Sequence, residues 1–348
     1  MSRTLIVPGN LLLFGEYAVL EQGGLGLACA TGPHVRAYLD PAEGFTVEGR
    51  LGARAATWTA GEECNSPEDF LCRVAGFAQR WCGERNIDIA ALNTRLVIDS
   101  TAFMSESGHK RGLGSSAAAT VALCAVVCDL AGIDDDATRF DLAVRAHRYA
   151  QGGRGSGYDV AVSYFGGLGL FRGGERPEFE PVSLEWLPPL SLYETGAPSS
   201  TSHAVSHYAA WKAAHREEAR AFLERSNNLI SRLVDRQTWS DARPIAGELA
   251  ELGKSLGRSI GVSADISPAV SGLGRGVNRG GAGANRSDTE GAKYSETEVG
   301  AIAHAENTDL CKAVGAGAEL AVCFGSAKGD ESSELSPVEI DWEGCTWR

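Results

Sequence analysis

The sequence lacks long uncharged apolar runs and paired cysteines, and each absence excludes a class of protein. No apolar stretch in the 348 residues reaches the length of a membrane-spanning helix. The opening residues MSRTLIVPGN lack the charged start, apolar core and small-residue cleavage site of a signal peptide. The nine cysteines are scattered without a C-x-x-C pair, so the spacing typical of zinc sites does not occur. We therefore expect a cytoplasmic protein whose cysteines are reduced and serve packing.

Basic residues are fewer than acidic ones. The chain has 32 Lys and Arg against 45 Asp and Glu, which gives a formal net charge of -13. This charge disfavours binding to nucleic acid or to an anionic membrane, because both partners would carry the same sign. A local basic pocket for a phosphorylated metabolite is compatible with it. We expect small-molecule partners only, and the sequence leaves monomer and homodimer open.

Length and periodicity predict two domains built from strands and helices. The chain exceeds the size at which one hydrophobic core usually stops growing. Apolar spacing and turn residues predict strands at 4–7, 11–14, 35–39, 96–98 and 321–324, and helices at 66–81, 117–130, 141–151, 202–234 and 244–256. Proline pairs and glycines near residues 188–198 suggest an N-terminal domain of residues 1–190 and a C-terminal domain of residues 191–348. Residues 272–300 are rich in Gly, Arg, Asn and Ser and are expected to form a surface loop.

A glycine–serine loop runs directly into an alanine-rich helix and predicts a phosphate-binding site. Glycines allow close approach of the backbone, and the unpaired N–H groups of the helix start face the anion together with the positive end of the helix dipole. Lys110 and Arg111 precede the loop and add positive charge. The residues expected to bind the nucleotide are Gly112, Leu113, Gly114, Ser115, Ser116, Ala117 and Ala118.

The loop alone does not decide between a nucleotide site and ordinary turn chemistry. The Walker pattern G-x-x-x-x-G-K-[ST] does not occur, and the third glycine of the dinucleotide fingerprint is missing. Other segments supply the context. Residues 8–19, PGNLLLFGEYAV, resemble the first signature of the GHMP kinases, a superfamily that includes galactokinase, homoserine kinase, mevalonate kinase and phosphomevalonate kinase. Residues 110–120 resemble the second signature, and residues 312–319 match the third in part.

This resemblance implies a fold and a cofactor. It implies a two-domain α+β protein, with an N-terminal domain like ribosomal protein S5 domain 2 that holds ATP. A ferredoxin-like α+β domain would follow it, with the site in the cleft between the two. ATP and Mg²⁺ are the implied cofactors, and Ser116 is the expected metal-binding hydroxyl.

The segment after the central helices separates branches of the superfamily. Ala150-Gln151-Gly152 and Asp159-Val160-Ala161 resemble the phosphomevalonate kinase branch, and His147 stands where mevalonate kinases place a metal-binding glutamate. The implied reaction is phosphorylation of phosphomevalonate to diphosphomevalonate in the mevalonate route to isoprenoids. Mevalonate kinase or another small-acceptor kinase is the main alternative.

The expected site has defined roles. Asp159 takes the acceptor's proton or holds nearby charges in place, and Lys110 neutralises phosphate oxygens. A helix cap is the plain alternative for Asp159 and for Ser116, and a solvated surface charge is the alternative for Lys110. Substrate contacts are expected from Asn10, Glu16, Tyr17, Arg148, Arg154, Ser156 and Ser200.

Two departures from the family pattern favour a rival of another class. Many relatives have lysine where this chain has Asn10, which supplies no charge, and Ala318 and Glu319 alter the third signature. Both departures are compatible with a catalytically weak homologue that binds a metabolite as a sensor. Turnover of ATP distinguishes this hypothesis from the kinase.

Overall fold

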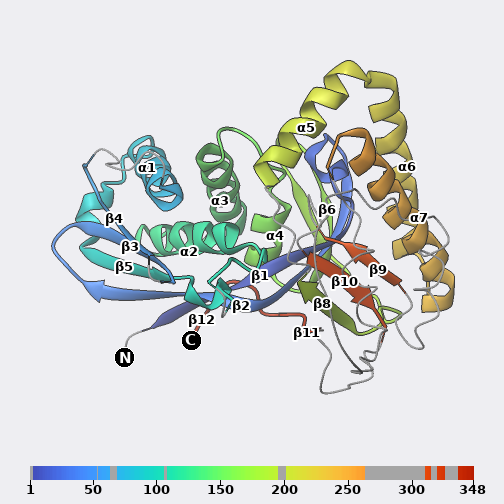
Figure 1. Cartoon of the computed structure of the whole chain (residues 1–348). Coiled ribbons are helices and arrows are strands. Elements are labelled where there is room, and N and C mark those ends of the chain that lie inside the picture. The colour runs from blue at the N-terminus through green and yellow to red at the C-terminus, as the bar shows by residue number, and fades with distance from the viewer. Residues whose placement is uncertain are drawn as a thin grey trace, which may run out of the picture.

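The protein contains two β-sheets with helices packed around them, as seen in a computed structural model (Figure 1). The structure describes residues 3–52, 54–62, 69–105, 108–194, 201–262, 310–314, 320–325 and 336–348. Residues 272–300, expected as a surface loop, lie outside these ranges. The combination of helices with two largely antiparallel sheets confirms the expected α+β class.

The first sheet has the order β12-β1-β2-β5-β3-β4, and β6 and β7 extend it from β2. Its neighbouring strands are antiparallel except for the parallel pair β3 and β5. The bounds are β1 Thr4–Phe14, β2 Leu25–Pro41, β3 Phe45–Leu51, β4 Arg54–Thr59, β5 Thr94–Asp99, β6 Leu168–Arg172, β7 Glu178–Pro181 and β12 Thr346–Trp347. The strands predicted at 35–39 and 96–98 are confirmed as parts of β2 and β5.

The predicted turn between two short N-terminal strands is wrong. Residues 4–14 form the single strand β1, and the break in apolar pattern at Pro8 and Gly9 corresponds to a register shift against β2. Gly9 allows a close approach at this point, because a Cβ there would lie 2.6 Å from the carbonyl oxygen of Leu113. The shift therefore brings β1 against the glycine–serine loop.

The second sheet has the order β11-β8-β10-β9 and is antiparallel. Its strands are β8 Leu190–Glu194, β9 Leu310–Ala313, β10 Leu320–Phe324 and β11 Ser336–Val338, so the strand predicted at 321–324 is confirmed. Cys311 and Cys323 lie opposite each other on β9 and β10 and form a disulfide, with Cα atoms 4.1 Å apart. The expectation that all cysteines are reduced is wrong for this pair.

The described residues form seven α-helices. They are α1 Phe70–Gly83, α2 Ser115–Leu130, α3 Asp136–Ala150, α4 Tyr158–Phe165, α5 Thr201–Ala214, α6 Arg216–Val234 and α7 Trp239–Ser259. The single long helix predicted at 202–234 is two helices, because the backbone at His215 leaves helical geometry. The helix predicted from residue 244 begins earlier, where Thr238 accepts a hydrogen bond from the amide of Asp241, and Pro244 lies inside it.

Helix α2 is the centre of the N-terminal half. Its residues 117–128 are all buried, which is the pattern of a helix covered on every side. It contacts β1 and β2 on one side and α1, α3 and α4 on others, and Figure 1 shows it between the first sheet and the helices α1 and α3. The loop at its start is therefore held by a rigid element.

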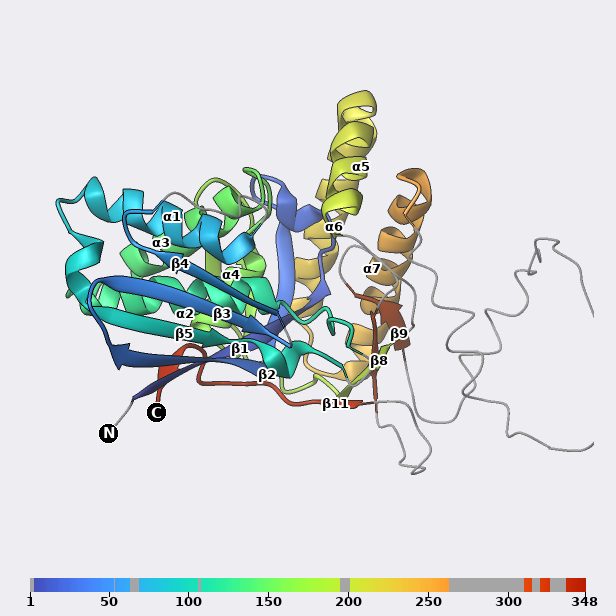
Figure 2. The same cartoon turned by 60° about the vertical axis from the view of Figure 1, so that its left-hand side comes forward.

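The two ends of the chain lie together. Strand β12 pairs with β1, and the amides of Thr4 and Arg348 each donate to the other residue's carbonyl (Figure 2). The boundary expected between residues 190 and 191 falls at the start of β8, the first strand of the second sheet, but the last residues of the chain return to the first sheet. Within the ranges described above, no helix is both long and apolar enough to cross a bilayer.

Candidate active site

A cleft of about 450 Å³ brings together most of the side chains expected at the site. It is lined by β1, the turn after it, the glycine–serine loop and the loop between α3 and α4, with residues of α5 and the second sheet on the remaining wall. The expected residues that line it are Asn10, Glu16, Tyr17, Lys110, Gly112, Leu113, Gly114, Ser115, Ser116, Arg154, Ser156 and Asp159. Segments distant in sequence therefore meet in one hollow.

The glycine–serine loop has the backbone of an anion site. Gly112 and Gly114 have φ angles of 71° and 77°, a region that favours glycine. Gly114 is the N-cap of α2 and offers no side chain, so no side chain caps the first amides of the helix. Ala117 and Ala118 were expected to bind the nucleotide as well. Both side chains are fully buried, and the amide of Ala118 already donates to the Gly114 carbonyl at 3.1 Å, whereas the amide of Ala117 belongs to the first turn of α2.

Asn10 is fixed against this loop. Its amide N–H donates to the carbonyl of Leu113 at 3.0 Å, and its side-chain Nδ2 donates to Oγ of Ser163 at 3.0 Å. A Cβ on Gly114 would lie 2.0 Å from Asn10 Nδ2. The side chain is 3% exposed and uncharged, so Asn10 contributes shape and a polar edge to the cleft but no positive charge.

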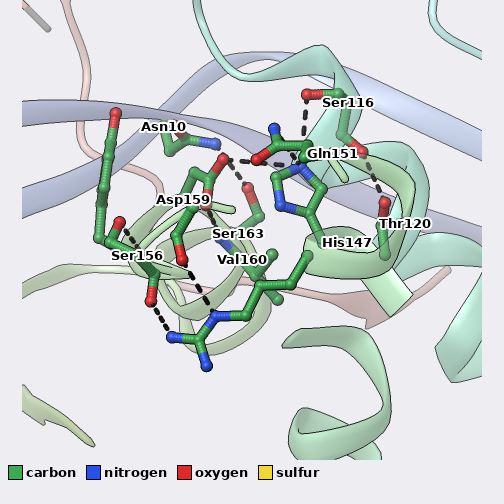
Figure 3. A network of polar contacts seen from close by, with 12 residues as sticks. Asn10, Ser116, Thr120, His147, Gln151, Ser156, Asp159, Val160 and Ser163 are labelled. Carbon is green, nitrogen blue, oxygen red and sulfur yellow. Dashed lines mark hydrogen bonds and ion pairs between the residues drawn. The ribbon is translucent and has the colours of Figure 1, made fainter. Parts of the chain in front are cut away.

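Asp159 lies in the first turn of α4, after Gly157 with a φ of 88°. Its Oδ1 accepts from the amide of Val160 at 3.0 Å, and its Oδ2 lies 3.7 Å from Nε2 of His147 (Figure 3). The positive end of the helix dipole favours a carboxylate here. Two helix starts, those of α2 and α4, therefore face the same cleft, one open to an anion and the other bearing a carboxylate.

Basic side chains outnumber acidic ones in the cleft, although the chain as a whole is acidic. Lys110, Arg111 and Arg154 line it together with Glu16 and Asp159. Arg111 carries a buried Nε atom without a hydrogen-bond partner among the described residues. Arg154 is exposed, and its Nη1 donates to Oγ of Ser206 on α5 at 2.6 Å. This local excess of positive charge suits a phosphorylated ligand.

Arg148 does not line the cleft. Its guanidinium donates to four backbone carbonyls, those of Gly155, Ser156, Gly174 and Glu175, at 2.6–3.0 Å. Burial lowers the pKa of Arg148, and nearby Asp159 opposes that effect. With its donors committed to main-chain oxygens, Arg148 joins two loops; this geometry favours a structural role over the expected substrate contact.

Glu16 and Tyr17 follow β1, and Glu16 contacts the second sheet while Tyr17 contacts α5. Glu16 forms a buried ion pair with Lys312 of β9, whose Nζ also donates to the Ala313 carbonyl at 2.8 Å. Tyr17 has a φ of 63° and packs against the ring of Tyr208 at 5.3 Å. Burial, with a further contribution from Glu16, raises the pKa of Tyr17 to about 12, so its hydroxyl is a neutral hydrogen-bonding group.

Several parts of the expected site lie outside the described residues, and other lining residues were not in the expected set. Ser200, Ala318 and Glu319 are outside, as is most of the partial third signature. Gln151 and Tyr158 line the cleft although the sequence analysis gave them no role. Both residues lie close to Asp159 in the sequence, and this proximity could have indicated a place in the cleft. Lys312 had no local signal, because its partner is 296 residues away.

The donor set fits Mg²⁺ held mainly by phosphate oxygens. No group of three or more His, Cys, Asp or Glu side chains that would bind a metal occurs within the described ranges. Ser116 and Asp159 place a hydroxyl and a carboxylate at the cleft, and Mg²⁺ prefers oxygen ligands and retains water. These two side chains would hold the ion together with the nucleotide, and the ion would neutralise phosphate charge.

Comparison with known proteins agrees with this geometry. Residues 77–167 match the family of GHMP kinases, N terminal domain. A phosphomevalonate kinase of Streptomyces sp. (strain CL190) is 29% identical over 196 residues, which are 50% of this chain and 51% of that protein. The match therefore spans about half the length of this curated relative.

Solved structures show the same fold at low identity. A Lin0012 protein from Listeria innocua superposes with a TM-score of 0.75 at 20% identity, covering 98% of this chain and 97% of that one. Streptococcus pneumoniae phosphomevalonate kinase in complex with phosphomevalonate and AMPPNP superposes with a TM-score of 0.67 at 16% identity, covering 92% and 91%. The matched family segment contains the loop, α2 and Asp159. Residues 77–167 of this chain are therefore similar to the GHMP kinase N-terminal domain, and the chain has the α+β fold of these solved structures.

Proposed function

We propose that the chain is an Mg²⁺- and ATP-dependent kinase that phosphorylates phosphomevalonate and yields ADP and diphosphomevalonate. The observation that carries this proposal is the meeting of two helix starts in one cleft, the loop before α2 and Asp159 in α4. The Streptomyces phosphomevalonate kinase supports the choice of acceptor. The three basic side chains that line the cleft, against two acidic ones, are compatible with an acceptor that carries a phosphate.

The nucleotide would lie with its phosphates at the start of α2. The free amides and the helix dipole there stabilise negative charge, and Lys110 and Arg111 add two cations at the same end of the cleft. Phosphoryl transfer depends mainly on positioning and on neutralising the oxygens of the transferred group. Mg²⁺ would supply further neutralisation when bound.

The acceptor would lie on the side of Asp159 and Arg154. One oxygen of the acceptor phosphate forms the new bond to the γ-phosphorus as the bond to the ADP oxygen breaks. The second pKa of a phosphate monoester is about 6, so this oxygen is already deprotonated at neutral pH. Asp159 would then orient the charged groups, and Arg154 would neutralise the acceptor phosphate in the bidentate geometry that arginine favours.

A hydroxyl acceptor must be deprotonated, whereas a phosphate acceptor is already ionised, and this difference allows the two acceptors to be compared. Mevalonate must lose a proton during transfer, so Asp159 would have to act as a general base. We expect kcat/KM for phosphomevalonate to exceed that for mevalonate by about 100-fold, equivalent to about 2.7 kcal/mol. ADP formation by the purified protein with each acceptor measures this ratio.

The Arg154→Ala variant probes the origin of the preference. It removes the exposed guanidinium at the acceptor end, and we expect the ratio to fall about 10-fold or more through the value for phosphomevalonate. Arg145→Ala removes a cation on α3 that does not line the cleft, and should leave the ratio unchanged. A higher kcat/KM for mevalonate would instead identify a mevalonate kinase.

A binding homologue without turnover is the second candidate, because the buried Asn10 brings no charge to the phosphates. Such a protein would bind ATP, as measured by calorimetry, but would form no ADP with any acceptor tested. Formation of ADP that depends on phosphomevalonate would exclude it.

A further inference from the structure

His147 is a buried imidazole that the proposed reaction leaves without a role. It lies in the last turn of α3 and is 1% exposed. Its Nε2 atom lies 3.5 Å from Oγ of Ser116, 3.7 Å from Oδ2 of Asp159 and 3.4 Å from the side-chain nitrogen of Gln151 (Figure 3). The ring therefore lies between the nucleotide side and the acceptor side of the cleft.

The two nitrogens of the ring have different surroundings. Nδ1 is buried and has no hydrogen-bond partner among the described residues. A proton on Nδ1 would thus be a buried donor without an acceptor, which costs about 1–3 kcal/mol. A proton on Nε2 faces two oxygens, those of Ser116 and Asp159. The two oxygens and the unpartnered Nδ1 favour the neutral tautomer with its proton on Nε2. The side-chain amide of Gln151, whose nitrogen lies 3.4 Å from Nε2, must then turn over so that its oxygen faces the ring.

Packing fixes the direction in which this proton points. The ring of Phe70 meets the imidazole edge-on with centroids 5.5 Å apart, and α3 itself packs against α1 and α2. An almost completely buried ring cannot turn away without displacing these neighbours. The donor is therefore held at a fixed point between a serine at the start of α2 and an aspartate at the start of α4.

We propose that His147 is a positioning residue of the kinase site, whose Nε2–H sets the spacing between the Ser116 hydroxyl and the Asp159 carboxylate. This proposal rests on the proposed function. The 3.5 Å contact with Ser116 is at the outer limit of a hydrogen bond and the 3.7 Å contact with Asp159 is beyond it, so the Nε2–H acts on the carboxylate as a nearby dipole. By orienting the groups that flank the phosphates, His147 acts through them and touches neither substrate.

The tautomer can be measured without any activity. Two-bond and three-bond ¹H–¹⁵N correlations distinguish the two neutral forms of histidine, and loss of one signal set in His147→Gln assigns the residue among the seven histidines. We expect a protonated Nε2 and an unprotonated Nδ1. A predominant proton on Nδ1 would overturn the proposal, whether or not the protein proves to be a kinase.

Three variants separate donation from packing. Glutamine places an amide nitrogen near the position of Nε2, asparagine places one near Nδ1, and phenylalanine fills the space without a donor. We expect His147→Gln to keep kcat within about 3-fold of the original protein, and His147→Asn and His147→Phe to lose about 10–100-fold, as for other supporting hydrogen bonds. KM for ATP should change less than about 3-fold in all three, because the loop amides are untouched.

The outcomes distinguish a positioning role from a structural one. Equal loss in the Gln and Asn variants would overturn the proposal, as would full activity in His147→Phe. Thermal unfolding of each variant identifies losses that arise from misfolding, and the Gln and Asn pair remains decisive if the Phe variant does not fold. Absence of turnover in the original protein would refute the proposed kinase, while the tautomer measurement would still decide the state of His147.

Discussion

The ammonium group of Lys312 on β9 lies against the carboxylate of Glu16, which follows β1. Both side chains are largely buried, with 6% and 11% of their surfaces exposed, and Lys312 also lies over the ring of Phe14 at 5.4 Å. The pair connects the second sheet to a residue that lines the cleft. An ion pair therefore connects this wall of the cleft to the second sheet.

Removal of Lys312 alone should lower the free energy of unfolding. Lys312→Met leaves Glu16 as a buried charge without a partner, and we expect a loss of about 3–5 kcal/mol in the free energy of unfolding. The double variant Glu16→Gln/Lys312→Met should lose less, because neither side chain is then charged. Chemical denaturation of the single and double variants measures both values.

The pair between Lys212 and Glu21 is a matched control. It also joins the segment after β1 to the C-terminal half, but 47% of the Lys212 side chain is exposed, and Glu21, which is 14% exposed, keeps a hydrogen bond from the Tyr208 hydroxyl at 3.0 Å. Lys212→Met should therefore cost only about 0–1 kcal/mol. An equal cost for the two lysine variants would show that burial does not determine the effect.

Gly114 should tolerate no side chain. Gly114→Ala combines a positive φ with a Cβ only 2.0 Å from Asn10 Nδ2, so we expect it to disturb the loop and weaken ATP binding. Gly132 has a similar φ of 70° with open space around it, and Gly132→Ala should show the backbone cost alone, about 1–2 kcal/mol. Unfolding and ATP titrations of both variants separate the two contributions.

The clash with Asn10 can be relieved on the other side. In Gly114→Ala/Asn10→Ala the obstructing amide is gone, and part of the lost stability should return while the backbone cost remains. Complete additivity of the two substitutions would contradict the packing described here.

Asp159→Asn should affect turnover and spare nucleotide binding. The substitution removes the charge beside His147 while keeping the size of the side chain, and we expect kcat to fall about 10²–10⁴-fold with hydroxyl acceptors and less with a phosphate acceptor. Asp135→Asn is the control, because Asp135 caps α3 from outside the cleft lining and asparagine caps helices equally well. Steady-state assays of ADP formation provide the comparison, and equal rates for the two variants would remove Asp159 from the mechanism.

Arg148 should matter for stability and little for acceptor affinity. Arg148→Ala leaves four carbonyls without their donor, and we expect a loss of about 2–4 kcal/mol in the free energy of unfolding. Arg145, one turn earlier, forms an exposed pair with Asp141 and lies over the ring of Phe77 at 5.7 Å, so Arg145→Ala should change stability by about 1 kcal/mol or less. A large rise in acceptor KM with unchanged stability in Arg148→Ala would restore the substrate contact first expected.

The sequence predicts best those features that are determined by residues adjacent to one another in the chain. The loop before α2 could be anticipated because glycines, hydroxyls and a run of helix formers follow one another within a few residues. The same reasoning does not separate Arg148 from Arg154. Both are arginines near Asp159, but the carbonyls that bind Arg148 include two from residues 174 and 175, which only the folded chain brings close.

Other features depend on contacts with no sequence signal. The disulfide between Cys311 and Cys323 arises from strand register in the second sheet, and the pairing of Glu16 with Lys312 arises where β9 approaches the segment after β1. Pro8 and Gly9 usually indicate a turn, but here a register shift keeps β1 continuous because β2 and the loop before α2 support it on both sides.

Strand β12 has a consequence for how the molecule avoids self-association. It covers the outer edge of β1 at Leu5 and Ile6, where unpaired main-chain groups would otherwise be offered to a neighbouring copy. The final residues thus protect an edge of the sheet that carries Asn10. Removal of these residues would leave main-chain groups of β1 unpaired, and we expect the shortened chain to aggregate more readily.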